Sequence, residues 1–387
     1  MKIELLVSKV KALLRKIIGY PVLYNVNKAD ENLLKKRALL IYLVKPFRLD
    51  KNDPKFLTHQ NLKQTLQIAS VLNQIGYIVD VADIKSKRIL SKKKYDLLIS
   101  HNFKLDISTL NLTQNAIKIY LASGMNHIIN NINIKKRYAD LYKRKGCKLK
   151  IRRLNDENMK YVEQADYIIG FGNQFTMDTW SKNFKQKKYY FNNYGFEKIK
   201  YIEKDFNLAK KNFLYFASSN QVGKGLDLLL EIFPKHPDLN LYVCGNYENE
   251  EDFCKCYHTE LYETPNIHPV GWVQVGSDKF YELVEKCAFV IMPSCSEGQP
   301  GSVINCMYAG LIPMVTKETG IELNESVIYF DSYSLNDIEK KITEIIIYPF
   351  GWYKEQSLNI KNIVVHKYSE QFFNERLISI LTEIINN

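Results

Sequence analysis

Residues 288–310 read AFVIMPSCSEGQPGSVINCMYAG, and this stretch indicates the class of fold. The apolar run at its start predicts a buried strand that ends at Pro293, and the segment after Pro300 predicts a helix that stops at Gly310. A loop with a single acidic residue, Glu297, joins the two. Ligands of open parallel sheets bind beyond the carboxyl ends of the strands, and the free N–H groups of a helix start attract phosphate. The stretch therefore predicts a phosphate site near Gly301 with one carboxylate beside it.

Short apolar runs alternate with helical stretches along the rest of the chain, which is typical of parallel sheets covered by helices. The strands that we expect are residues 38–44, 77–82, 96–100, 117–121 and 166–170, then 212–217, 239–244, 288–292, 312–315 and 327–330. The two sets predict an α/β protein with two doubly wound, Rossmann-like domains that face each other across a cleft. We expect the domains to span residues 1–200 and 201–387, with the last helix packing back on the first domain.

Composition narrows the class of protein. The 387 residues are 46% hydrophobic and 25% charged, a balance that excludes a disordered chain, a collagen and a membrane-embedded bundle. No run of about 18 apolar residues is present, so we expect no membrane-spanning helix. The net charge of +12 predicts an anionic partner, such as a nucleotide, a phosphorylated substrate or an acidic lipid surface. Nucleic acid is not expected, because no helix-turn-helix, ribonucleoprotein or zinc-finger signature accompanies the charge.

Basic residues gather in two segments. Residues 1–20 predict a basic amphipathic helix, which either docks on the protein itself or rests on an anionic membrane face. Residues 135–153 hold many Lys and Arg side chains against the single acid Asp140, as a solvated helix face or as a site for a lipid-diphosphate acceptor or an anionic membrane. Together the two segments favour a cytoplasmic protein that is peripheral on the inner face of the cytoplasmic membrane.

Cysteine use predicts the redox compartment. The 7 cysteines are an odd, scattered set, unlike that of a disulfide-stapled secreted domain, so we expect free thiols in a reducing cytoplasm. The segment Cys254-Lys255-Cys256-Tyr257-His258 looks briefly like a metal site, but no second pair follows at zinc-site spacing.

A second motif with glycines follows the first strand of the second domain. Residues 222–226, VGKGL, open the next helix, where the glycines allow close backbone approach and Lys224 supplies a positive charge for a phosphate. Alone, the motif is also typical of a surface turn. Its place at the same sheet edge as Glu297 favours the phosphate interpretation.

With these motifs, the chain resembles the retaining glycosyltransferases of the GT-B fold, in particular glycosyltransferase family 4, the group 1 transferases. In the C-terminal half the resemblance rests on residues 223–226, 271–273, 293–300, 309–313, 367–369 and Phe372. In the N-terminal half a bacterial branch of that group is matched by residues 58–61, 95–102, 123–127 and 166–172. The resemblance covers nearly the whole chain and implies GT-B architecture.

The resemblance implies a hexosyltransferase-type enzyme, EC 2.4, that moves a sugar from a nucleotide-sugar donor to a glycan or lipid-linked glycan, with retention. Such enzymes serve cell-surface polysaccharide or lipopolysaccharide synthesis. By resemblance, Glu297 contacts the transferred sugar, Lys224 neutralises the leaving diphosphate, and His127 faces the anomeric centre and the acceptor. The other substrate-binding residues that the resemblance implies are Gly223, Gly298, Pro300, Gly301, Ser302, Asn305, Ser219 and His59. No cofactor and no metal are expected, since no Asp-x-Asp motif follows a strand.

Two positions depart from the family's pattern. Asn305 stands where a second glutamate takes the ribose hydroxyls, and its amide can donate one hydrogen bond and accept another. Ser219 stands where an arginine is frequent, so one cation is missing or comes from Arg153, Lys187 or Lys188. Two alternatives stay open: a nucleotide-sugar epimerase of the same fold, and a catalytically weak, glycosyltransferase-like binding protein. The sequence does not distinguish uridine from guanosine donors.

Overall fold

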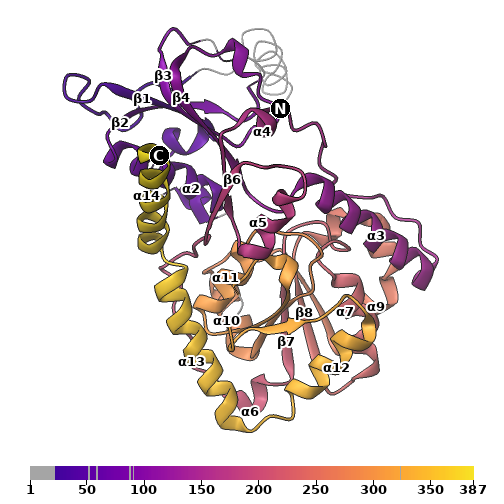
Figure 1. The fold of residues 1–387 in the computed structure, drawn as a ribbon. Helices are drawn as coiled ribbons and strands as arrows, with labels where there is room; N and C mark the ends of the chain where they lie inside the picture. The colour runs from indigo at the N-terminus through magenta and orange to yellow at the C-terminus, as the bar shows by residue number, and fades with distance from the viewer. Residues whose placement is uncertain (1–21, 51–52, 58–59, 87–88, 90, 323) are drawn as a thin grey trace, which may run out of the picture.

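The computed structural model describes residues 22–387 except 51–52, 58–59, 87–88, 90 and 323. Within these residues the chain forms two parallel six-stranded sheets flanked by helices (Figure 1). The basic helix expected at residues 1–20 and the expected site residue His59 lie outside the described residues.

The first sheet has the strand order β2-β1-β3-β4-β5-β6. Its strands and helices are β1 (Lys36–Tyr42), α2 (Gln60–Gln74), β2 (Tyr77–Asp83), β3 (Tyr95–Ser100), β4 (Leu112–Ala122), α3 (His127–Lys145), α4 (Lys160–Gln164), β5 (Tyr167–Phe171), α5 (Gln174–Ser181) and β6 (Lys187–Phe191). Neighbouring strands pair in parallel, and the order of addition reverses between β1 and β3. The loops after β1 and β3 therefore border the crevice in which such sheets bind ligands.

The second sheet has the order β12-β11-β10-β7-β8-β9. Its strands and helices are α6 (Phe206–Ala209), β7 (Asn212–Phe216), α7 (Leu226–Ile232), β8 (Asn240–Cys244), α8 (Glu251–Cys256), α9 (His258–Tyr262), β9 (Ile267–Gly271), α10 (Asp278–Lys286), β10 (Phe289–Met292), α11 (Gly301–Tyr308), β11 (Ile312–Thr316), β12 (Ile328–Phe330), α12 (Leu335–Ile345), α13 (Phe350–Lys367) and α14 (Glu370–Asn386). Here the order reverses between β7 and β10, the two strands that precede Lys224 and Glu297. Both residues thus follow strands at the reversal point, where ligands of such sheets bind.

The predicted fold class is confirmed, but two strands were not expected. Both β6 and β9 lie at the edge of their sheets. Strand β6 starts with two lysines, and β9 contains His268 and Pro269. Charged residues and proline are tolerated at sheet edges, where one face of the backbone ladder is unpaired. Their sequences therefore lack the continuous apolar run by which the central strands were recognised.

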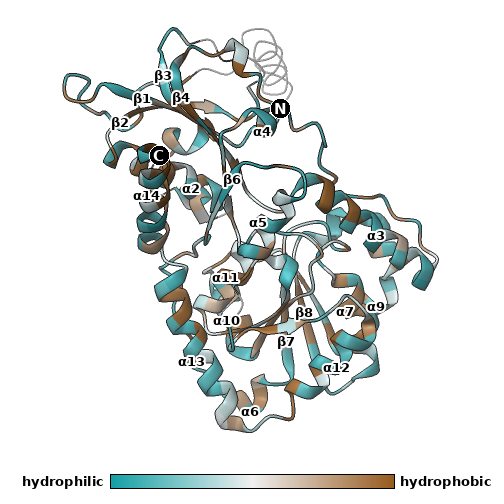
Figure 2. Cartoon of the chain, in the orientation of Figure 1, coloured by the Kyte–Doolittle hydropathy of each residue, from teal (hydrophilic) through white to brown (hydrophobic). Residues whose placement is uncertain are grey.

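Helix α14 returns to the first sheet. Its buried side chains, which include Phe373, Leu377 and Ile380, join the core formed by β1, β2 and α2. Figure 1 shows α14 beside α2, with α13 running along the C-terminal half and leading to it. Figure 2 shows α12 and α13 banded in teal and brown, as helices with one buried and one solvated face should be. In the part of the chain that the structure describes, no helix combines the length and apolar character needed to cross a bilayer.

Helix α3 precedes β5 in the chain but packs into the core of the second sheet. Ile134, Tyr138 and Leu141 are buried among residues of the C-terminal half. Figure 1 shows α3 lying against that half beside α7 and α9. Each half therefore packs a helix on the other: α3 lies on the C-terminal half, and α14 lies on the N-terminal half. We call these two contacts the clasp between the halves.

Several basic side chains of the segment 135–153 form ion pairs within the protein. Arg137 Nη2 lies 2.7 Å from Asp227 Oδ1, and both side chains are almost fully buried. Further along, the cations pair with acids of the C-terminal half, as the contacts Arg144–Asp227, Arg144–Glu231, Lys145–Glu260 and Arg152–Asp252 show. Lys135, Lys136, Lys143, Lys148 and Lys150 are exposed and form no ion pair within the part of the chain that the structure describes. These lysines, and the half-exposed Arg153, remain for an external anion.

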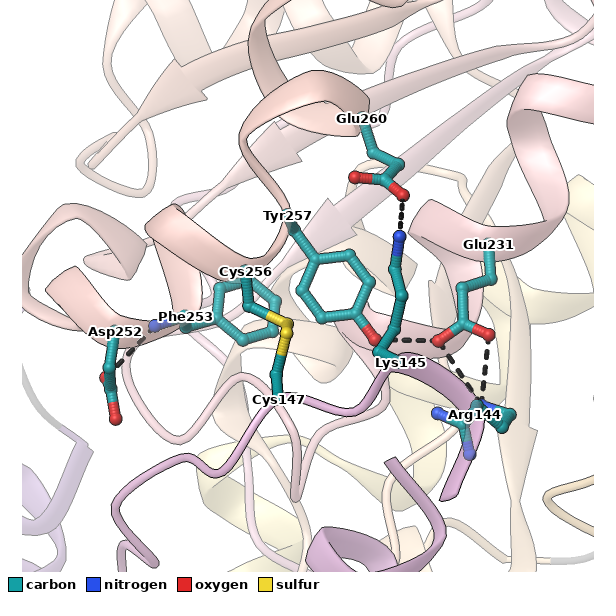
Figure 3. Close-up of a disulfide and its surroundings, with 9 residues drawn as sticks. All are labelled: Arg144, Lys145, Cys147, Glu231, Asp252, Phe253, Cys256, Tyr257 and Glu260. Atoms are coloured by element: carbon teal, nitrogen blue, oxygen red, sulfur yellow. Dashed lines mark hydrogen bonds and ion pairs between the residues drawn. A yellow bond between two sulfur atoms is a disulfide. The ribbon is translucent and has the colours of Figure 1, made fainter. Parts of the chain in front are cut away.

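A disulfide joins Cys147 to Cys256, two residues 109 positions apart. The expectation of free thiols is wrong for this pair, because α3 carries Cys147 onto α8, a contact that cysteine spacing cannot reveal. The bond also removes Cys256 from the metal-like segment 254–258. Figure 3 shows the bond beside Tyr257 and near the pairs Arg144–Glu231 and Lys145–Glu260, so it reinforces the contact that α3 makes with the C-terminal half. The other five cysteines are free.

Breaking this bond should destabilise the protein. In the double variant Cys147→Ser, Cys256→Ser we expect the free energy of unfolding to fall by about 2–4 kcal/mol, because the crosslink closes a long loop in the unfolded chain. Urea unfolding measures the change, and Cys254→Ser, a neighbouring free thiol, is the matched control. In denaturant without reductant, alkylation should label 5 thiols in the wild type. Labelling of all 7 cysteines under those conditions would refute the disulfide.

Candidate functional site

A cavity of about 330 Å³ lies between the two halves, within the range of roughly 300–1,000 Å³ typical of small-molecule sites. Its walls come from loops at the carboxyl ends of both sheets. The C-terminal half contributes residues that follow β7, β8, β9 and β10 and the start of α11. The polar side chains from the N-terminal half are Tyr42, Gln60, Asn61, Gln64, His101, Ser123, Arg153 and Asn193.

Three charged side chains meet in this cavity. Lys224 Nζ lies 3.2 Å from Glu297 Oε1, and Arg153 Nη1 lies 3.2 Å from the same oxygen. Burial alone would raise the pKa of the Glu297 carboxyl, but the two cations outweigh it and hold that pKa below its ordinary value. Burial lowers the pKa of Lys224, and Glu297 offsets this only in part. Glu297 is therefore ionised at neutral pH, and this single carboxylate faces two basic side chains.

The loops after β7 and β10 are held together by their backbones. Cys295 N–H donates to the carbonyl of Gly223 at 2.9 Å. Gly225 has φ +82°, and a Cβ at this position would lie only 2.4 Å from the Pro293 carbonyl oxygen, so both the backbone angle and the space require glycine. This close packing explains why the motif at 222–226 places Lys224 against Glu297.

The start of α11 faces the same cavity. Pro300 is the N-cap residue and supplies no side-chain hydrogen bond, and Gly301 and Ser302 line the cavity wall. Among the described residues, neither the Gly301 nor the Ser302 N–H has a hydrogen-bond partner. Unpartnered N–H groups at a helix start carry partial positive charge and suit an anion. Pro300, Gly301 and Ser302 thus lie where the sequence placed them.

Gly298 and Gly223 do not line the cavity. A Cβ on Gly298 would lie 2.2 Å from the carbonyl oxygen of Ser123, so this glycine lets a loop of the N-terminal half pack on the Glu297 loop. The Gly223 carbonyl is occupied by the contact to Cys295. The structure therefore gives both glycines packing contacts at the edge of the site.

Asn305 and Ser219 are placed differently from each other. Asn305 lines the cavity, and its Oδ1 accepts the Phe196 N–H at 2.8 Å. Because an amide oxygen has two lone pairs, the side chain keeps its NH₂ donor and one acceptor position. Ser219 is exposed and stands outside the cavity wall, whereas its neighbour Ser218 is part of it.

The structure does not bring His127 to the cavity. Its ring is 4.4 Å from that of Phe103 and 5.9 Å from that of Trp180, measured between centroids. Its Nδ1 is 2.9 Å from the carbonyl oxygen of Asp156. Burial lowers the pKa of this imidazole, so the ring is neutral.

His101 is the histidine that lines the cavity. It follows β3 at the reversal point of the first sheet, with Nδ1 2.7 Å from the Leu121 carbonyl and Nε2 3.3 Å from Ser123 Oγ. Burial lowers its pKa as well, so it is neutral at pH 7. Reasoning from the sequence passed over His101, although its place directly after a predicted strand was a usable signal.

An amide network crosses between the halves behind the charged cluster. Gln299 Nε2 donates to Asn192 Oδ1 at 2.7 Å, and Gln299 Oε1 accepts the Asn193 N–H at 2.7 Å. Gln64 Nε2 donates in turn to Asn193 Oδ1 at 2.7 Å. The network ties α2 to the Glu297 loop and fixes the depth of the cavity.

A known family model matches part of the C-terminal half. Residues 198–349 match the family model described as Glycosyl transferases group 1, which confirms the resemblance in that segment. No curated protein matches the chain by sequence.

Comparison with solved structures shows the fold. Sucrose-phosphate synthase from Thermosynechococcus elongatus has a TM-score of 0.64 at 12% identity, over 91% of this chain and 100% of that chain. HepE from Anabaena, solved with UDP and glucose, has a TM-score of 0.56 at 13% identity, over 90% of this chain and 99% of that chain. TarM has a TM-score of 0.51 at 16% identity over 75% of this chain, and the match spans about half (53%) of TarM. The two-domain GT-B architecture predicted from the sequence is confirmed.

Proposed function

We propose that this chain is a glycosyltransferase that transfers a sugar from a nucleotide-sugar donor bound in the cavity between its halves. One observation carries the proposal. Lys224, Arg153 and two unpartnered N–H groups of α11 converge around Glu297, at the reversal point of the C-terminal sheet. A positive cluster with one carboxylate suits a ligand in which a diphosphate is joined to a sugar.

The strand order gives the orientation of the donor. Glu297 follows β10, Lys224 follows β7, and Trp272 and Val273 follow β9 in the order β10-β7-β8-β9. Neighbouring strands lie about 4.8 Å apart, so roughly 14 Å separates the two ends of this wall. An extended nucleotide sugar spans such a distance. The sugar lies at Glu297, the diphosphate at Lys224 and α11, and the base near the half-exposed ring of Trp272.

The residues at the Glu297 end can lower the barrier to transfer. The bond between the anomeric carbon and the diphosphate oxygen breaks, and negative charge builds on the leaving diphosphate. Lys224, whose side chain is buried, and the α11 N–H groups stabilise that charge electrostatically. Glu297 accepts hydrogen bonds from the sugar hydroxyls and holds the ring in place.

The acceptor reaches the sugar from the N-terminal half. His101 lies on that wall and His127 does not, so we assign the acceptor side to His101. HepE was solved with UDP and glucose, which supports a uridine donor of a hexose here. We infer transfer with retention to a glycan or lipid-linked glycan, in cell-surface polysaccharide or lipopolysaccharide synthesis.

We propose that the protein binds to a membrane surface. The exposed lysines Lys135, Lys136 and Lys143 share α3 with Ile132 and Tyr142, whose side chains are about half exposed. Lysines beside exposed apolar groups suit an anionic lipid surface. We therefore propose a cytoplasmic protein that is peripheral on the inner face of the membrane.

The two alternatives are less well supported. An epimerase needs paired acids or bases around the sugar, and Glu297 is the only acid among the described residues that line the cavity. A binding protein without turnover is favoured by Asn305, a neutral amide where the family has a glutamate.

A binding screen followed by an assay of donor cleavage tests the proposed function. We expect UDP or GDP to raise the melting temperature of the full chain, because a ligand at 100 times its Kd adds about 2.7 kcal/mol of stability. We further expect at least one UDP- or GDP-sugar to release the nucleoside diphosphate when glycan or lipid acceptors are supplied. Binding without release would favour the binding protein, and the absence of both would refute a nucleotide-sugar site.

A further inference from the structure

Arg153 reaches the charged cluster from the other half of the molecule. It lies between α3 and α4, whereas Lys224 and Glu297 follow strands of the second sheet. Its side chain is about half exposed (51%), against 6% for Lys224 and 11% for Glu297. In the described part of the chain, Glu297 is the only acid within ion-pair distance of Arg153. Arg153 is thus the accessible cation of the cluster.

One carboxylate cannot neutralise two cations. Lys224 and Arg153 contact the same oxygen of Glu297, each at 3.2 Å. Lys224 is buried and its position is fixed, so Arg153 carries the surplus positive charge toward the cavity. An anion beside the start of α11 would find this guanidinium free to leave Glu297, since one positive partner would remain for the carboxylate.

The backbone around Arg153 is held on both sides. Arg153 itself has φ +57°, a left-handed angle that is unfavourable for a residue other than glycine. Its carbonyl accepts from Asn130 Nδ2 at 3.1 Å, and Arg152 Nη1 lies 3.2 Å from Asp252 Oδ2. The Cys147–Cys256 bond anchors the start of the connection between α3 and α4, which contains Arg153 (Figure 3). Strain of this kind persists where the surrounding contacts enforce it.

The other two cations considered from the sequence are engaged elsewhere. Lys187 pairs with Glu383 at 2.8 Å, and Lys188 donates to the carbonyls of Phe184 and Gln186. Neither lines the cavity. Arg153 is therefore the cation that is placed to meet a ligand together with Lys224.

We propose that Arg153 binds the diphosphate of the donor, exchanging Glu297 for a phosphate oxygen when the donor enters. This proposal rests on the function proposed above. Because Arg153 belongs to the N-terminal half and Lys224 to the C-terminal half, a bound diphosphate is held from both sides. Donor binding would then strengthen the clasp between the halves.

Isothermal titration of the full chain with UDP and GDP tests this assignment. We expect Arg153→Gln to weaken binding of the nucleoside diphosphate at least about tenfold, since hydrogen bonds between charged groups are stronger than those of a neutral amide. Arg153→Lys should restore part of the affinity. Lys150→Gln, which removes the same charge from an exposed neighbour, should leave affinity unchanged. The affinity for uridine and guanosine, which lack phosphate, should be equal in Arg153→Gln and wild type.

The outcomes separate the two proposals. If wild type binds UDP or GDP and Arg153→Gln binds it equally well, the assignment of Arg153 is overturned and the proposed function stands. An equal loss of nucleoside affinity would also overturn it, because the variant would then have disturbed the whole cavity. If wild type binds neither diphosphate and cleaves no donor, both proposals fall.

Discussion

Lys224→Met should lower the turnover of donor cleavage at least about 100-fold, a loss of about 2.7 kcal/mol, which is typical when a group that stabilises developing charge is removed. Methionine fits the buried stem of Lys224 but cannot meet the negative charge of the leaving diphosphate. Without donor, Glu297 keeps Arg153 as a partner in this variant, so the empty site still holds one cation against the carboxylate. Single-turnover measurement at saturating donor reports the effect on the chemical step.

Lys224 also predicts how turnover depends on pH. Burial keeps the pKa of Lys224 below its ordinary value. Turnover should therefore fall as the pH rises through that lowered pKa, because the neutral amine no longer stabilises the leaving group. Lys224→Arg should move this basic limb to higher pH, since a guanidinium stays charged.

A matched surface variant separates a local effect from a general loss of charge. Lys235→Met removes an exposed lysine of the same half, which pairs with Glu339 at 3.3 Å. It should leave turnover unchanged. If Lys224→Met turned over the donor at the rate of Lys235→Met, Lys224 would have no part in the reaction.

Asp227→Asn should lower the free energy of unfolding by about 3–5 kcal/mol, the cost of leaving a buried charge without its partner. Asp227 is fully buried and lies 2.7 Å from Arg137 Nη2 and 2.6 Å from Arg144 Nη2. Asparagine keeps the shape but removes the negative charge, and Arg137, whose side chain is 2% exposed, cannot reach water instead. Because this pair docks α3 on α7, the variant should also loosen the clasp between the halves.

Urea unfolding of Asp227→Asn and of a control checks this expectation. Asp238→Asn removes the same charge from an exposed pair with Lys211 and should cost no more than about 1 kcal/mol. Equal unfolding midpoints in the two variants would show that the buried pair does not hold α3 in place.

The central part of the C-terminal half was predictable from local sequence. The strands expected at 212–217, 239–244 and 288–292 match β7, β8 and β10 to within one residue at each end. The positions of Lys224, Glu297 and Gly301 followed from the rule that sites lie after parallel strands. A short apolar run, a glycine-rich turn and a helix start are all defined by neighbouring residues, so periodicity and turn chemistry suffice.

The N-terminal wall of the site was not predictable in this way. His127 and His101 both follow expected strands, and only the packing of Phe103 and Trp180 around His127 shows which of them is enclosed. The basic segment 135–153 gave no sign that many of its charges pair with acids of the other half. An amphipathic pattern defines a buried face but does not identify the surface on which that face packs.

The amino-acid order alone was therefore enough for two α/β domains, for a helix start at Gly301 that follows a strand, and for Lys224 and Glu297 at the same sheet edge, because each depends on contacts within a few residues. The folded chain was needed to show the Cys147–Cys256 bond, the Arg137–Asp227 pair and the approach of Arg153 to Glu297. The residues in these contacts are separated by 109, 90 and 144 positions. Such contacts join residues of the two different halves, so no local sequence pattern encodes them.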